Sequence, residues 1–197
     1  MNRRERKKEE TRGNIITCAV RLFKEKGFKE TLMEEISEKA DVSKGTLYNY
    51  FEDKESILSG YYQSIIADYG KEINANLKIN QGIKARLDNL LDFISKIFGN
   101  DIDLVTVYFR NRMQTLFDSN PLDNPQRSGL ENTVLEIMKE AQERGELRDD
   151  IPALVIARNL QFLVMSYFIS NLYSEVPLKM DDFKQQLIGL FLNGAKR

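Results

Sequence analysis

Histidine and tryptophan are both absent from this chain of 197 residues. Without histidine the chain lacks the usual general base, the commonest metal ligand and every Ser-His or Cys-His catalytic arrangement. The single cysteine, Cys18, cannot form an intrachain disulfide or a thiolate metal cluster, and its amphipathic surroundings predict a small core residue. We therefore expect no catalytic residue, no metal site and no cofactor.

Long apolar runs are also missing. The longest, Phe162 to Ile169, is interrupted by Ser166 and is too short to span a bilayer. The first ten residues are rich in charge and do not resemble an export signal. These features predict a cytoplasmic protein that does not bind membranes.

Basic and acidic residues are nearly equal in number, since the formal net charge is −1. Residues 1–54 carry 13 Lys/Arg against 11 Asp/Glu, and the remaining residues carry 16 against 19. The basic excess includes an N-terminal arm, which contains Arg3, Arg4, Arg6, Lys7 and Lys8. Two interpretations of this arm stay open: contacts to DNA phosphates or the minor groove, and a charged disordered tail.

Helical periodicity dominates the chain, and no stretch shows the alternation of a strand. We expect an all-α fold of about nine helices, with three in a helix-turn-helix DNA-binding domain (1–53) and six in an effector-binding and dimerisation domain (54–197). After the third helix, the expected helices are Lys54–Leu77, Ile83–Phe98, Asp101 or Asp103 to Phe117, Leu130–Arg144, Pro152–Ser174 and Asp181–Ala195. A loop rich in turn residues is expected at 118–125.

The segment from Thr31 to Lys54 predicts two short helices joined by a tight turn. Thr31 and Glu34 have the spacing of a capping box, which places the first helix start at Thr31. Asp41-Val42 forms the predicted turn, and Ser43 can cap the second helix.

The second of these helices, Lys44 to Tyr50, has few residues suited to a core. Leu47 is expected to point inward, together with Phe51 just beyond the helix. The outward residues are Lys44, Gly45, Thr46, Tyr48, Asn49 and Tyr50. Hydrogen-bond donors, aromatic edges and a glycine on one exposed face are typical of a helix that enters the major groove of DNA.

The sequence GTLYNYFEDKE, preceded by Val42-Ser43-Lys44, resembles the signature of the TetR family of bacterial transcriptional regulators. The resemblance covers about Thr11 to Leu58 and departs at Asp41, where the family more often has glycine. It implies that Lys44, Gly45, Tyr48 and Asn49 meet base edges, and that Thr31, Thr46, Tyr50 and Lys54 hold phosphates, with Ser43 at the helix start. The alternatives are that Tyr48 or Tyr50 packs against the first helix and that Lys44 is a solvated surface lysine.

The last two expected helices have wide apolar faces. Residues 160–169 are apolar nearly all round, and a helix of this kind must be buried on every side. Either both helices are central in one subunit, or they pair with their two-fold copies in a homodimer. The family resemblance favours the homodimer.

Aromatic and methionine side chains are dense after residue 54, and most of them must be ordinary core. We expect some to line an effector cavity, with candidates Tyr62, Tyr69, Phe93, Tyr108, Phe109, Arg112, Met113, Phe162 and Met165. Arg112 meets an acidic ligand in one interpretation and lies at the surface or the dimer interface in the other.

The leading functional hypothesis is a ligand-responsive regulator, a repressor that binds a palindromic operator in double-stranded DNA as a homodimer. A small apolar or aromatic effector would release it. One alternative is a DNA-bound TetR-type protein whose C-terminal domain recruits a protein partner. Another is a helical-bundle enzyme, which the missing catalytic motifs argue against.

Overall fold

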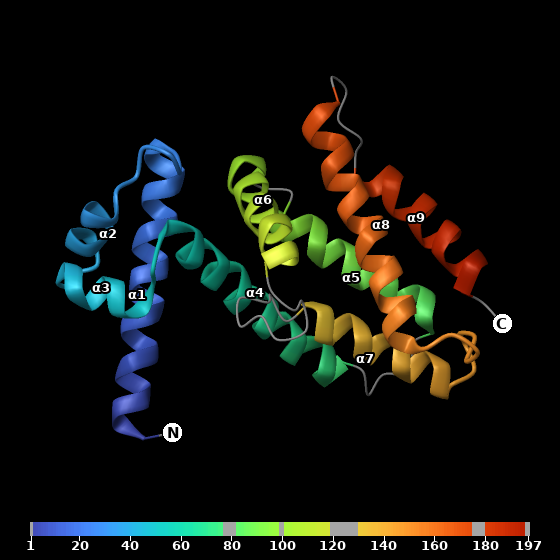
Figure 1. Ribbon diagram of the computed structural model, residues 1–197. Helices are drawn as coiled ribbons and strands as arrows, with labels where there is room; N and C mark the ends of the chain where they lie inside the picture. Colours follow the sequence, from blue (N-terminus) through green and yellow to red (C-terminus); the bar gives the residue numbers. More distant parts are fainter. Residues whose placement is uncertain (1, 77–81, 99–100, 119–129, 175–179, 196–197) are drawn as a thin grey trace. The chain divides into compact units, whose positions relative to one another are not determined.

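A computed structural model describes residues 2–76, 82–98, 101–118, 130–174 and 180–195. These residues form nine helices and no strand, so the all-α prediction is confirmed (Figure 1). The helices are α1 (Arg3–Lys26), α2 (Met33–Lys39), α3 (Lys44–Tyr50), α4 (Lys54–Asn76), α5 (Ile83–Phe98), α6 (Ile102–Asp118), α7 (Leu130–Glu143), α8 (Ala153–Tyr173) and α9 (Met180–Ala195). Most of the loop expected at 118–125 lies outside the described residues.

The chain divides into two compact units. One contains Met1–Ile66 and Asp101–Ser128, and therefore holds α1 to α3, the first part of α4, and α6. The other contains Ala67–Asn100 and Gly129–Arg197, with the rest of α4 and α5, α7, α8 and α9. The predicted domain boundary at residues 53 and 54 remains a prediction.

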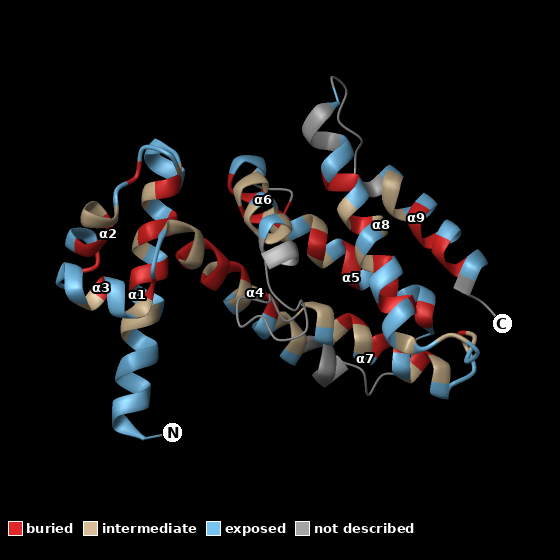
Figure 2. Ribbon diagram, in the orientation of Figure 1, coloured by how far each residue is buried: buried red, intermediate tan, exposed pale blue. Residues whose placement is uncertain are grey.

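Helix α1 is longer than the resemblance alone implies, because it begins at Arg3. Asn2 caps it: the Asn2 side chain accepts from the backbone N–H of Arg4 at 2.9 Å, and Glu5 accepts from the backbone N–H of Asn2 at 2.9 Å. The basic arm is thus helical, and its interpretation as a disordered tail is wrong. Figure 2 shows this first part of α1 as exposed, whereas Ile15 and Phe23 further along are buried.

Helix α2 starts one residue later than the capping prediction. Leu32 occupies the N-cap, and the Glu35 carboxylate accepts from its backbone N–H at 2.8 Å. Lys26 from the end of α1 also donates to Glu35. Both bonds lower the pKa of Glu35, and the bond from Lys26 has the larger effect. The predicted pair of Thr31 and Glu34 is wrong because Thr31 instead donates to the Gly27 carbonyl at 2.8 Å, closing the loop after α1.

The second unit is built around four packed helices. Helix α5 packs on α7 and α9, and α8 also packs on α7 and α9. Leu87, Leu90 and Leu91 of α5 are fully buried there. Arg86 is buried as well, and its guanidinium lies 3.1 Å from the Glu140 carboxylate of α7. A buried arginine needs such a partner because desolvation of an unpaired charge is costly.

Helix α8 is the most apolar helix. By length and composition alone, its segment Ala153–Ser170 could cross a membrane. The shorter apolar run at residues 162–169, noted in the sequence, could not. Length and composition do not separate a membrane span from the central helix of a helical bundle. Here α8 packs against α7 and α9, while one third of this segment is buried.

Candidate nucleic-acid interface

The turn between α2 and α3 is set by two side chains. Asp41 has a φ of 53°, which is the left-handed region that aspartate tolerates better than most residues. Ser43 then caps α3, since its hydroxyl accepts from the backbone N–H of Thr46 at 3.0 Å. Both features agree with the sequence prediction.

Helix α3 buries one side chain in the core and exposes a polar face. Leu47 is its buried residue, and Phe51 just beyond it is buried too. Exposed residues of the described α3 are Lys44, Gly45, Tyr48 and Asn49, whereas Thr46 and Tyr50 are half-buried. Half of the Tyr48 surface is exposed, so its ring is not buried against another helix. An aromatic ring held in water on a rigid helix is available to contact bases.

Lys44 forms an ion pair at the surface. Its ammonium lies 3.4 Å from the Glu34 carboxylate of α2, and both side chains are largely exposed. Two hydrogen bonds lower the pKa of Glu34. The larger effect comes from the backbone N–H of Glu34 and the smaller one from Lys44. An exposed pair of this kind contributes little stability, so separating Lys44 from Glu34 costs little. Sequence reasoning missed Glu34 in this role.

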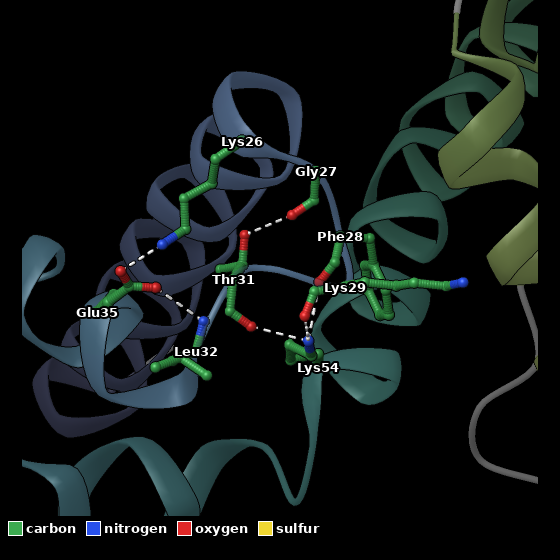
Figure 3. A network of polar contacts seen from close by, with 8 residues as sticks. All are labelled: Lys26, Gly27, Phe28, Lys29, Thr31, Leu32, Glu35 and Lys54. Atoms are coloured by element: carbon green, nitrogen blue, oxygen red, sulfur yellow. Dashed lines mark hydrogen bonds and ion pairs between the residues drawn. The ribbon is translucent and has the colours of Figure 1, made fainter.

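Two residues expected to hold phosphates face inward instead (Figure 3). Thr31 is fully buried, and its hydroxyl donates a hydrogen bond to the Gly27 carbonyl. The Lys54 ammonium donates to the carbonyls of Phe28 at 2.8 Å, Lys29 at 3.1 Å and Thr31 at 2.8 Å. Because a lysine ammonium has three donors, all of them are satisfied within the protein. Within the chain these two side chains join α4 to the loop after α1. Their contact with phosphates stays a prediction.

Further residues fix α1 against the rest of this unit, and no sequence pattern singles them out. The Asn14 side chain donates to the Ala40 carbonyl at the end of α2, at 2.8 Å. The Arg12 guanidinium lies 5.3 Å from the centre of the Phe51 ring, within the range of a cation–π interaction. Arg12 sits among charged residues in the sequence, so only the fold distinguishes it.

The predicted effector residues fall into both units. In the first unit, the Tyr62 and Tyr108 rings lie 4.5 Å apart, Phe109 packs edge-on against Tyr108, and Arg112 and Met113 are half-buried. Burial raises the pKa of Tyr62.

In the second unit, Tyr69 stacks on Phe93 with ring centres 3.3 Å apart and donates to the Asn89 carbonyl. Met165 is half-buried, but Phe162 is 66% exposed. Phe162 is therefore not enclosed within one subunit, and its place in the effector site stays a prediction.

The arrangement of α1 to α3 has known counterparts. Residues 15–60 match the family described as bacterial regulatory proteins, tetR family. The match contains the capped turn and the whole exposed face of α3. The chain belongs to the TetR family. This is a family of DNA-binding transcriptional regulators and not an enzyme family.

Individual relatives align over different lengths of this TetR-family chain. The regulator HbdR of Aromatoleum sp. (strain CIB) is 40% identical over 65 residues, which are 33% of this chain and only 28% of that protein. The fatty acid metabolism regulator protein of Bacillus subtilis (strain 168) is 23% identical over 176 residues, covering 89% of this chain and 87% of that one.

A solved structure resembles nearly the whole TetR-family chain. It is FadR of Thermus thermophilus, a TetR-family transcriptional repressor in complex with lauroyl-CoA. The TM-score is 0.76 at 24% identity, over 93% of this chain and 94% of that chain. At this identity the similarity shows that the two chains share a fold.

Proposed function

We propose that this chain is a transcriptional repressor that binds an inverted-repeat operator as a homodimer and leaves it when a fatty-acyl thioester binds. The observation that carries the proposal is the exposed face of α3, with Lys44, Tyr48 and Asn49 projecting from a capped and rigid turn. A helix with this face suits the major groove, where donors and aromatic edges distinguish base pairs.

The homodimer is supported by an exposed apolar row on α8. Val155, Phe162 and Ile169 follow one another at seven-residue spacing and are 44%, 66% and 43% exposed. Leu190 of α9 is 67% exposed as well. Large apolar side chains that lie exposed in a row mark an interaction surface. Pairing α8 and α9 with their two-fold copies would cover them, as in a four-helix contact.

The effector class is supported by the two long alignments. The B. subtilis relative is named for fatty acid metabolism, and the T. thermophilus repressor was crystallised with lauroyl-CoA. The aromatic cluster of Tyr62, Tyr108 and Phe109 offers an acyl chain an apolar environment. Each buried methylene is worth about 0.8 kcal/mol, so a long chain supplies ample affinity. Helix α4 runs unbroken from Lys54 to Asn76 and is the element suited to transmit the change.

DNA recognition can be tested on a duplex that the protein itself selects. A preferred duplex is isolated from a randomised pool with the full chain, and its affinity is then measured by gel shift. We expect Tyr48→Ala or Lys44→Ala to cost about 1–3 kcal/mol against that duplex. Lys139→Ala is the control, because Lys139 pairs with Glu136 on the exposed side of α7. Unchanged affinity and sequence preference in Tyr48→Ala would show that α3 does not read the groove.

Dimerisation is tested by Phe162→Glu, which leaves the single subunit intact because Phe162 is exposed in it. We expect light scattering to give a dimer for the wild type and a monomer for the variant, with loss of operator binding. A wild-type monomer at micromolar concentration, with the α8 face free, would favour the alternative in which this domain recruits a different protein.

The effector is tested with lauroyl-CoA, against coenzyme A alone and dodecanoate. Lauroyl-CoA should raise the melting temperature and weaken operator binding roughly 5- to 150-fold, the usual range of allosteric coupling. Stabilisation without a change in operator affinity would argue against the coupling. No stabilisation by any of the three compounds would argue against the effector class.

A further inference from the structure

The N-terminal part of α1 is a helix over which no other described segment packs. Residues 2–10 are all exposed, yet the capping box of Asn2 and Glu5 holds the first turn in place (Figure 2). A helix end that is fixed but uncovered can present side chains to a partner at defined positions.

One row of this helix end is basic. Arg4, Lys7, Lys8 and Thr11 lie at spacings of three and four residues and so share one face. The next step of the row is Ile15, which is fully buried in the core. The row therefore continues the inward side of α1, but with cations in place of apolar side chains. None of the three cations forms an ion pair within the described residues, while Arg6 on the opposite side pairs with Glu10 at 3.4 Å.

The basic row borders a hollow beside α3. Arg4, Glu5, Lys7, Lys8, Thr11 and, from the end of α3, Tyr50 line this hollow of about 550 Å³. Glu5 is the acidic member, and its carboxylate already accepts from the Asn2 backbone N–H. The Thr11 hydroxyl donates to the Lys7 carbonyl at 2.9 Å. Three cations and the Tyr50 hydroxyl remain to meet an anion.

We propose that this hollow holds a DNA phosphodiester just outside each half-site, an inference that rests on the DNA binding proposed above. The hollow adjoins Tyr50 on the helix whose exposed face we assign to the major groove, so the strand that borders this groove passes close to it. Neutralisation of phosphates by Lys and Arg dominates the affinity of proteins for DNA, and a tyrosine hydroxyl is a common additional donor to phosphate oxygens. The site would extend the footprint without reading sequence.

The test compares Arg4→Gln with Arg6→Gln in the full chain. The two changes remove the same group from the same helix, about 200° apart around its axis. Affinity is measured by gel shift between about 50 and 200 mM salt, on the selected duplex and on versions shortened one base pair at a time from both ends. Tyr50→Phe, which removes only the hydroxyl, is measured in the same way.

On the long duplex, we expect Arg4→Gln to reduce the salt slope by about 0.9 for each half-site, or about two for a dimer. Arg6→Gln should keep the wild-type slope, and Tyr50→Phe should weaken binding with little change in slope. On a duplex cut back to the half-sites, wild type and Arg4→Gln should bind alike. Equal slopes for Arg4→Gln and Arg6→Gln, or an Arg4→Gln effect that survives shortening, would overturn the inference while leaving DNA binding intact. A wild-type chain that selects no duplex would overturn the proposed function as well.

Discussion

The bonds made by Lys54 lead to a prediction that differs from the one based on family resemblance. Lys54→Met keeps the apolar stem but removes the ammonium from the carbonyls of Phe28, Lys29 and Thr31. Hydrogen bonds to a charged group contribute about 1.5–3 kcal/mol each, and two of these three are partly buried. Because water can reach the third, we count only the two partly buried bonds and expect a loss of about 3–6 kcal/mol in the free energy of unfolding. For a chain of this size, that loss lowers the melting temperature by roughly 6–24 °C.

The assay has two independent readouts. Thermal and urea unfolding followed by circular dichroism measure stability, and the salt dependence of operator binding measures phosphate contacts. Lys29→Met is the matched control, since it removes an exposed lysine from the same loop. We expect Lys54→Met to be destabilised with an unchanged salt slope, and Lys29→Met to retain wild-type stability.

The opposite result would refute the structural role of Lys54. If Lys54→Met were as stable as the wild type and lost about one unit of salt slope per half-site, then Lys54 would be a phosphate ligand that leaves the loop on binding DNA. Loss of both stability and slope would mean that the same ammonium serves both roles.

Backbone and glycine positions give further predictions. Asp41→Val should destabilise the chain by about 1–2 kcal/mol in urea unfolding, because a β-branched residue is strained at this positive φ, whereas Asp41→Gly should be tolerated. Gly60→Ala should cost about 1–3 kcal/mol, since a Cβ there would lie 2.9 Å from the Arg12 guanidinium and 3.2 Å from the Phe51 ring. Gly13→Ala meets no atom within 4 Å and should stabilise α1 by about 0.5–1 kcal/mol, so equal melting temperatures for these two alanine variants would contradict the packing.

Helix boundaries can be predicted where a polar side chain caps the helix itself. Asp53 stands directly before the fourth helix, where an aspartate is a favoured cap, and its carboxylate accepts from the backbone N–H of Ser56 at 2.7 Å. Ser43 caps α3 in the same way. Both assignments depend on bonds between residues three apart, and spacing along the chain determines such bonds. The fifth helix, Ile83–Phe98, is also predicted at its observed bounds because its apolar period is regular.

The inward roles of Thr31 and Lys54 could not be predicted from spacing. The capping pattern favours Thr31 with Glu34, because Leu32 has no side-chain acceptor, yet in the structure Glu35 accepts from the Leu32 backbone N–H. The outcome depends on Gly27 and Lys26, which the end of α1 brings close by. The bonds of Lys54 cross 23 to 26 residues of chain, and no local pattern encodes them.

The exposed face of α8 shows how composition and structure answer different questions. Composition indicates that residues 160–169 must be covered on every side, but it cannot say whether the cover comes from the same chain. The structure buries Leu160 and Tyr167 within one subunit and leaves Phe162 and Ile169 exposed. Helix α8 packs on α7 and α9, and Tyr167 lies against Phe183 of α9, so the helix has one covered side and one exposed side. A folded chain does not keep a row of large apolar side chains in water without a partner, so composition and structure together favour a second copy over a more central place in the bundle.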